Sequence, residues 1–459
     1  MANNNCKYYK VVRQVSYDNG VTWVNIGETQ KGDLYEYDSA ECGAVTQYRW
    51  VDVTGAYTCE GTTKYQKTKK QYSSDGGQTW SDVSPAEYGK GQVIDYHSTD
   101  CGYVPSPYET QYFTISLRES TTIAFCGSTD SNSLSYSRDG GATWTPLANG
   151  AQTPRLSAGE KIMWKGNCTP IGPTNPQTEQ PEGRKGIGVF YAGLKKADVE
   201  GNIMSLLFGD NFIGKTNLTG YDWAFASLFC NKNLDVINAN NLILPATTLS
   251  TGCYYGMFQG SLNLVSIPEL PATTLAPYCY AWMYELTNVA SIPAGYLPAT
   301  TLAPYCYAWM FAITKVTSIP SGLLPSTTLA VGCYCRMFES CKNLETVPID
   351  LLPATTLADR CYQGMFGSGY SDGSNAPRFT TAPDLPASTL TYMCYWKMFD
   401  NHIRLTSVKC LATDISATYC TDDWLNNVSS SGTFTKASSM ESWTRGKDGI
   451  PTNWSVQNA

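Results

Sequence analysis

Residues 270–284 read LPATTLAPYCYAWMY, and residues 297–311 read LPATTLAPYCYAWMF. The near-identical return of a sequence after 27 residues is typical of a repeat architecture, in which each turn buries its apolar side against its neighbours. We therefore expect a solenoid of eight turns over 224–425, with atypical copies at both ends. Cysteines recur in step with this repeat, at gaps of 26, 27, 27, 28, 33 and 26 residues: Cys253, Cys279, Cys306, Cys333, Cys361, Cys394 and Cys420.

Each turn divides into two halves. Cysteine and methionine stand four residues apart, as do the neighbouring aromatic residues, which predicts a short helix with one apolar face. Pro277 and Pro304 suit the first turn of such a helix. The other half, for example 264–268, predicts a short strand that ends at a proline. Because one turn has too few large side chains to fold alone, only stacked neighbours can stabilise it.

The column of cysteines predicts a dry interior. One thiol per turn, with no histidine nearby, is typical of a small buried hydrophobe and not of a metal site. The chain has 17 cysteines and shows no CxxC pair, so we expect buried, reduced thiols. The same interpretation covers the local group Cys333, Cys335 and Cys341.

Two features of the predicted solenoid are candidate binding sites. The pairs Tyr278 with Trp282 and Tyr305 with Trp309 stand beside the cysteine row. If they face solvent, consecutive turns would stack them into an aromatic shelf suited to a sugar ring, and the alternative is packing between helices. The longest cysteine gap holds an inserted loop, and such loops project from one face of a solenoid. Its candidate contact residues are Tyr370, Asp372 and Arg378.

The N-terminal third carries a different repeat. The pattern S-x-D-x-G-x-T-W occurs at 16–23, 73–80 and 137–144. Its Asp-Asn-Gly or Asp-Gly-Gly supplies positive-φ positions of a tight turn, and its tryptophan can pack under the loop. Each copy therefore predicts a β-hairpin. The pattern resembles the Asp-box of sialidases and other propeller proteins, where it is a structural turn remote from catalysis.

We predict a mainly β protein with short helices, in which N-terminal β-hairpin or β-sandwich-like modules precede an α/β solenoid. The proline-rich and glycine-rich stretch after Thr169 predicts a linker between them. The expected divisions are tandem Asp-box modules at 1–103, a third module at 104–170, a linker at 171–186, an N-terminal cap region at 187–223, the solenoid at 224–425 and a C-terminal cap at 426–459.

Composition excludes several function classes. A net charge of −7 argues against binding the phosphate backbone of a nucleic acid. No apolar run reaches the roughly 18 residues that a membrane span needs, so no membrane insertion is expected. With only two histidines, His97 and His402, which we expect at the surface or in turns, we expect no catalytic residues, no metal site and no cofactor. The first residues show no charged-then-apolar signal segment.

Residues 220–425 resemble the BspA-like subclass of leucine-rich repeats, because a strand of the form L-x-x-I-x-P precedes an aromatic-cysteine segment. The asparagine ladder of the usual consensus is absent, and the LPATTL connection departs from it. Asp-box modules joined to such repeats resemble proteins encoded by tailed phages of gut Bacteroidales, including the crAss-like group.

This resemblance implies a non-enzymatic virion protein, such as a fibre or spike, that is assembled in the host cytoplasm and freed by lysis. Its implied partners are other virion proteins and a host-surface glycan or protein, and homo-oligomer formation stays open. The alternatives are a bacterial BspA-like surface adhesin and a glycan-processing enzyme. The enzyme would need two carboxylates about 5 to 10 Å apart, and the sparse acids show no such pairing by spacing.

Overall fold

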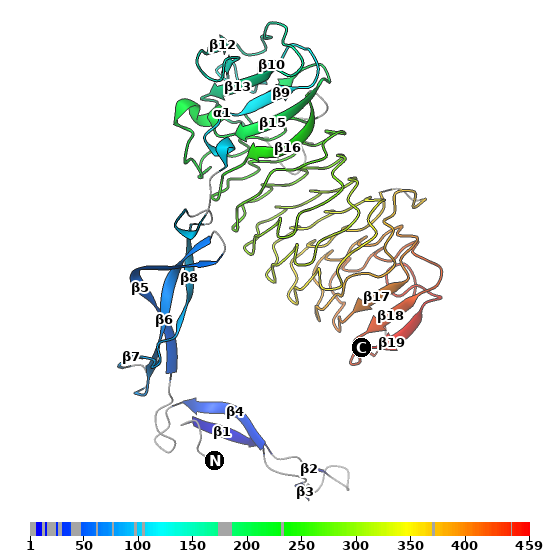
Figure 1. Cartoon of the computed structure of the whole chain (residues 1–459). Coiled ribbons are helices and arrows are strands. Elements are labelled where there is room, and N and C mark those ends of the chain that lie inside the picture. Colours follow the sequence, from blue (N-terminus) through cyan, green and yellow to red (C-terminus); the bar gives the residue numbers. More distant parts are fainter. Residues whose placement is uncertain are drawn as a thin grey trace. The chain divides into compact units, whose positions relative to one another are not determined.

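The computed structural model describes the chain as a mainly β protein with several open sheets and very few helices (Figure 1). The chain divides into two compact units, Met1–Pro105 and Ser106–Ala459. The described residues, of which those up to 37 are described by backbone alone, are 6–11, 14–15, 24–25, 30–37, 47–60, 63–75, 78–95, 99–102, 106–172, 186–230, 234–369, 372–441 and 443–459.

The first unit is built from antiparallel pairs. Its main sheet has β6 at the centre, paired with β5 along one edge and with β7 and β8 along the other. Strand β1 pairs with β4, and β2 with β3. The bounds are β1 Cys6–Val11, β2 Gln14–Val15, β3 Val24–Asn25, β4 Gln30–Tyr37, β5 Gln47–Glu60, β6 Thr63–Ser73, β7 Ser81–Asp82, β8 Tyr88–Asp95 and the 3-10 turn η1 Thr99–Cys101.

The second unit begins with a six-stranded sheet in the order β12-β11-β13-β9-β15-β16, beside the pair β10-β14. Trp164, Phe113 and Phe190 are fully buried in its core. Its elements are η2 Pro107–Glu109, β9 Thr114–Leu117, β10 Ala124–Gly127, β11 Leu134–Ser137, β12 Thr145–Leu147, β13 Lys161–Gly166, β14 Gly188–Tyr191, β15 Lys196–Asn202, α1 Ser205–Phe208, η4 Gly209–Asn211 and β16 Asp235–Ile243.

Most of the linker predicted at 171–186 lies outside the described residues. Strands before and after it pair with one another, β10 with β14 and β9 with β15. The stretch therefore connects two parts of one compact unit and does not separate two domains.

Residues 202–208 are mostly apolar, and the sequence predicts a buried strand there. That prediction is wrong after its first residue, because Asn202 ends β15 and Ser205–Phe208 form the helical turn α1. The Asn202 side chain accepts a hydrogen bond from the Met204 amide at 3.0 Å, which turns the chain out of the strand direction.

From β15 onward, neighbouring segments run parallel. Strand β15 pairs with β16 in parallel, and β17 Ser407–Cys410, β18 Thr433–Lys436 and β19 Ser455–Asn458 form a parallel sheet near the C-terminus. Between these ends, single parallel bridges join one repeat to the next, for example Thr274 to Thr301. The successive repeats of residues 223–427, called the repeat region below, lie side by side (Figure 1).

The helix predicted in each repeat is wrong. Residues 276–286 form consecutive turns, and their backbone N–H groups alternate between two acceptors. Tyr278, Tyr280 and Trp282 donate to carbonyls of the next repeat at 2.8–3.0 Å. Cys279 and Ala281 donate to the third residue back in their own repeat. Half of these groups therefore hold adjacent repeats together, which an α-helix cannot do because its N–H groups bond within the helix.

Backbone dihedrals show the physical reason. Every fourth residue has a positive φ, as at Tyr278, Trp282 and Leu286, each with φ of 57°. The first of these is the third residue of a turn that begins at Ala276 and has Pro277 second, which is the arrangement of a type II turn. A helix has no left-handed residues, so this segment cannot be one. Its four-residue period nevertheless puts positions i and i+4 on one side, as a helix would.

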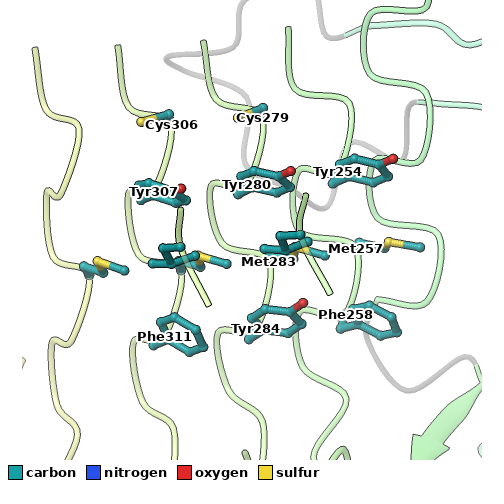
Figure 2. Packing of buried hydrophobic residues seen from close by; sticks show 14 of the residues in the cluster. Tyr254, Met257, Phe258, Cys279, Tyr280, Met283, Tyr284, Cys306, Tyr307 and Phe311 are labelled. Carbon is teal, nitrogen blue, oxygen red and sulfur yellow. The ribbon is translucent and has the colours of Figure 1, made fainter. Parts of the chain in front are cut away.

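The sides facing inward form four columns of buried side chains (Figure 2). Each column has one side chain from each repeat. The columns are a row of cysteines, a row of tyrosines, a row of methionines and a second aromatic row. Rings of the tyrosine column, which runs from Phe225 through Tyr280 to Trp424 and Trp443, stack at centroid distances of 5.5–6.2 Å. Rings of the second row, from Phe229 to Phe399, stack at 5.3–5.9 Å. These columns make a continuous core.

Candidate functional site

The sequence-predicted aromatic pairs stack from one repeat to the next. Tyr278 and Tyr305 are nearly parallel, with centroids 5.2 Å apart, and Trp282 and Trp309 are nearly parallel at 4.4 Å. All four side chains are half-buried and pack on the buried residues Ala281 and Ala308 among others. We call the set Trp223, Tyr255, Tyr278, Trp282, Tyr305 and Trp309 the outer ladder.

The sequence suggests two interpretations of these pairs, an exposed aromatic shelf and packing between neighbouring segments, and the structure has features of both. The rings form a partly exposed ladder, but they do so by stacking on one another. Trp282 has Tyr255 of the preceding repeat at 5.1 Å and Trp309 of the following repeat at 4.4 Å. Since the rings cover one another's faces, the outer ladder offers mainly ring edges to a ligand.

Glycines make room for this ladder. A Cβ atom on Gly252 would lie 2.3 Å from the Trp223 ring, and one on Gly332 would lie 2.3 Å from the Tyr305 ring. Both glycines have positive φ, at 60° and 59°. Each aromatic side chain therefore leans over the backbone of the next repeat, at a position where a side chain would collide with it.

Charged groups lie beside the rings of the ladder. The Arg336 guanidinium lies 5.5 Å from the centroid of the Trp309 ring, and its Nη1 donates to Glu339 at 2.6 Å. Gln259 donates to Glu285 at 2.5 Å. Burial raises the pKa of both glutamates above the ordinary value, because it penalises the charged carboxylate. The site therefore combines aromatic edges with a cation and two carboxyl groups that already have protein partners.

The inserted loop is fastened to the repeats at its ends and exposed at two of its predicted contact residues. Asp372 is exposed and accepts the Ser374 amide at 2.9 Å, while Arg378 is exposed and pairs with Glu345 at 2.9 Å. Tyr370 lies outside the described residues. The loop follows the fifth cysteine of the column, whereas the aromatic pairs flank the second and third, so no described contact joins the two candidate sites.

The thiols of the repeat region are buried as predicted. Burial raises the pKa of Cys253 and Cys306 to about 12, so these groups stay protonated at neutral pH. Among the described residues, no group of three or more His, Cys, Asp or Glu side chains is placed to hold a metal ion.

Two expectations for individual residues are wrong. Cys59 and Cys101 of the first unit form a disulfide, although all thiols were expected reduced. His402 is fully buried, not at the surface, and neither of its ring nitrogens has a hydrogen-bond partner among the described residues. Its ring packs edge-on against Phe379 at 4.5 Å, and burial lowers its pKa to about 3. The second histidine, His97, lies outside the described residues.

Two Asp-box hairpins have the predicted form. Asp75, between β6 and β7, accepts the Thr79 amide at 2.9 Å and the Ser73 hydroxyl at 2.6 Å. Asp139, between β11 and β12, accepts the corresponding Thr143 amide at 2.9 Å. These hydrogen bonds lower the pKa of both carboxyls, that of Asp139 to about 2. The copy at 16–23 lies outside the described residues. Both described aspartates are occupied by their own loops, which fits a structural role.

No family model matches the chain, and no curated protein or solved structure matches it either. Among the described residues, no helix has the length and apolar character needed to cross a membrane.

Trp223, Tyr255 and Arg336 belong to the site but are not predicted from the sequence. A signal for Trp223 and Arg336 exists in the repeat alignment. Each stands at the position of Tyr278 or Trp282 in its own repeat, directly before a cysteine slot or three residues after a cysteine. Tyr255 stands one position earlier than Trp282, and Gly256 occupies the position of Trp282, so no column alignment would find Tyr255.

Proposed function

We propose that the chain is a non-enzymatic structural protein of a tailed phage particle, exposed as a fibre, spike or similar component, and that it contacts a host-surface glycan or protein. In this proposal residues 224–425 form a continuous leucine-rich-repeat-like solenoid of the BspA-like kind. The N-terminal Asp-box modules attach it to the particle or to a partner chain.

The observation that carries the proposal is the bonding between repeats. Every repeat donates alternate backbone N–H groups to the next, and stacked aromatic columns continue through all of them. Such a stack holds its outer residues at fixed spacing over a long surface. Stiff display of repeated side chains suits attachment more than it suits catalysis, which needs a concave site.

Contacts of the acidic side chains also favour a non-enzymatic role. Glu285 is engaged by Gln259, and Glu339 by Arg336. Asp384, another acid of the repeat region, pairs with Lys409 at 2.5 Å. A glycan hydrolase would need a general acid and a second carboxylate that are available to substrate.

One observation fits the second candidate, a bacterial surface adhesin, as well as it fits the first. The Cys59–Cys101 disulfide lies at the surface of the first unit, and disulfides persist mainly outside the reducing cytoplasm. A virion component released by lysis and a displayed adhesin would both meet these conditions, so location in the native source decides between them.

Mass spectrometry of purified phage particles is the test. The proposal expects peptides of this chain in particles banded on a density gradient, at constant stoichiometry to a major virion protein. Peptides found in the cell-surface fraction of an uninfected bacterium, and absent from particles, would contradict it and support the adhesin.

A binding assay tests the attachment surface. Purified protein is expected to bind host cells, and Trp309→Ala combined with Arg336→Ala is expected to weaken that binding at least about tenfold, because it removes the last ring of the outer ladder and the guanidinium beside it. Tyr191→Ser, an exposed aromatic of β14 outside the repeat region, is the matched control. Equal loss in both variants would show that the ladder is not the contact surface.

A further inference from the structure

We propose that the sheet of β5, β6 and β8 in the first unit is a self-association surface, and that its aromatic face packs against the same face of a second copy of this chain. This inference deepens the proposed function by naming the partner of the N-terminal modules.

The first observation is that this sheet lacks a core. Among the residues whose side chains the structure describes in Met1–Pro105, only Thr68 and Ser73 are buried, and no hydrophobic side chain is. A small antiparallel sheet needs a hydrophobic face covered by another layer to be stable. Cross-strand hydrogen bonds and one disulfide join these strands, but nothing described in this unit covers either face.

The second observation is that four of the five large exposed aromatic residues described in this sheet lie on one of its two faces, while the fifth, Tyr88, pairs with Lys69 on the other. Paired residues share a face, and residues two apart along a strand do so too. By the register of β5 with β6, Tyr48 opposes Tyr72 and Trp50 opposes Lys70, while Tyr57 opposes Gln66. All four aromatic side chains therefore lie on one face, and their exposed fractions are 60%, 51%, 43% and 38% for Tyr48, Trp50, Tyr57 and Tyr72.

A glycine keeps this face flat at its centre. Gly89 of β8 pairs with Thr68 of β6, and a Cβ atom at Gly89 would lie 3.0 Å from the Trp50 ring. The Trp50 ring thus lies across β6 and onto β8. It covers Thr68 and makes one aromatic surface continuous over three strands.

Charge distinguishes the two faces and points to the occupant. On the aromatic face, Lys70 pairs with Glu87 at 2.9 Å and Lys64 pairs with Asp100. On the opposite face Lys69 pairs with Asp82 at 2.8 Å, while Arg49 and Lys67 have no acidic partner among the described residues. An acidic partner would therefore favour the opposite face. The aromatic face has its cations matched within the chain, so an equally apolar and charge-balanced surface fits it best, and a second copy supplies one.

Area agrees with a dimer. The exposed parts of the four aromatic side chains amount to roughly 400 Å², given about 150–250 Å² for a whole aromatic side chain. That is about half of the ~800 Å² that each partner gives to a stable interface. The polar residues between these rings and the long β5 edge can supply the rest.

The test measures the mass of the full chain by light scattering over a range of micromolar concentrations. We expect a concentration-dependent dimer, and we expect Trp50→Ser and, separately, Tyr48→Ser to weaken it roughly thirtyfold or more. The control Tyr191→Ser removes an equally exposed aromatic from the second unit and is expected to leave the dimer unchanged. Intact mass under non-reducing conditions checks that the Cys59–Cys101 bond has formed, which shows that a variant sheet has folded.

A wild-type chain that stays monomeric at all concentrations would overturn the inference, as would a Trp50→Ser variant that folds and still dimerises with unchanged affinity. A monomeric chain that is nevertheless found in particles would leave the proposed function standing and assign this face to a different virion protein. A chain that dimerises through this face but is absent from particles would support the inference and contradict the proposed function.

Discussion

Two glycines of the repeat region with positive φ differ in how closely a neighbouring repeat approaches them. Gly332 has positive φ and lies under the Tyr305 ring, whereas Gly322 has positive φ but nothing within 4 Å of an added Cβ atom. Both would suffer the same left-handed strain as alanine. Only Gly332 would also force a buried contact apart.

We therefore expect Gly332→Ala to lower the free energy of unfolding by about 2–4 kcal/mol, and Gly322→Ala by about 1 kcal/mol. Urea denaturation followed by circular dichroism measures both. Equal losses in the two variants would mean that the Tyr305 ring does not lie over this backbone.

His402 is a buried group whose environment makes the fold sensitive to acid. Equivalent positions in earlier repeats hold the small residues Ser261, Thr287, Thr314 and Cys341, which bond to backbone carbonyls. At His402 both nitrogens are buried with no partner in the described part of the chain, and burial lowers the pKa from 6.5 to about 3. Because the folded pKa is the lower one, stability is complete above pH 6.5 and falls as the pH drops towards 3.

We expect His402→Thr to flatten this part of the pH dependence. Unfolding of the wild type should lose up to roughly 4 kcal/mol between pH 6.5 and pH 3 through this residue. Chemical denaturation at a series of pH values measures the difference between the two proteins. If both lose stability in parallel over that range, His402 is not the group that titrates.

At the scale of one repeat, the sequence predicts which side chains are buried better than it predicts the backbone conformation. The cysteine spacing correctly predicts which side chains are buried, since both a helix and a chain of four-residue turns place Cys279 and Met283 on one side. It cannot distinguish 3.6 from 4 residues per turn over nine residues. The deciding fact is a positive φ at Tyr278 and Trp282, and aromatic residues give no sign of it because they rarely adopt it.

For the candidate site, too, there is a physical reason why the sequence alone predicts only part of the geometry. The pairs Tyr278 with Tyr305 and Trp282 with Trp309 follow from the repeat alone. Coverage of the ring faces depends on how each ring leans over the next repeat. For Tyr305 this requires Gly332, whose role is visible only when neighbouring repeats are seen together. The Cys59–Cys101 pairing joins residues 42 apart with no motif between them.

Removal of one whole repeat tests whether the repeat is the structural unit. Deletion of 279–305 joins Tyr278 to Cys306 and restores the sequence LAPYCYAWMF, so every column stays in register. We expect this variant to fold with a smaller denaturant dependence of unfolding, because less surface is exposed. Deletion of 279–291, about half a repeat, shifts all columns and is expected to prevent folding of the repeat region. Two equally folded variants would contradict the repeat model.

At the scale of the whole molecule, one property links fold and proposed function. The seven thiols of the cysteine column, from Cys253 to Cys420, lie in a core that is shared by all repeats, and each is buried. A stiff, exposed display of outer residues depends on that shared core, because no repeat is stable alone. Cys126, by contrast, is exposed on β10 and gives an internal reference for thiol reactivity.

Alkylation of the native protein, mapped by peptide mass spectrometry, tests this most directly. We expect iodoacetamide to modify Cys126 under native conditions and to leave Cys253, Cys279, Cys306, Cys333, Cys361, Cys394 and Cys420 unmodified until denaturant is added. Modification of these seven thiols at a rate similar to that of Cys126, without denaturant, would contradict the continuous buried core and the function proposed from it.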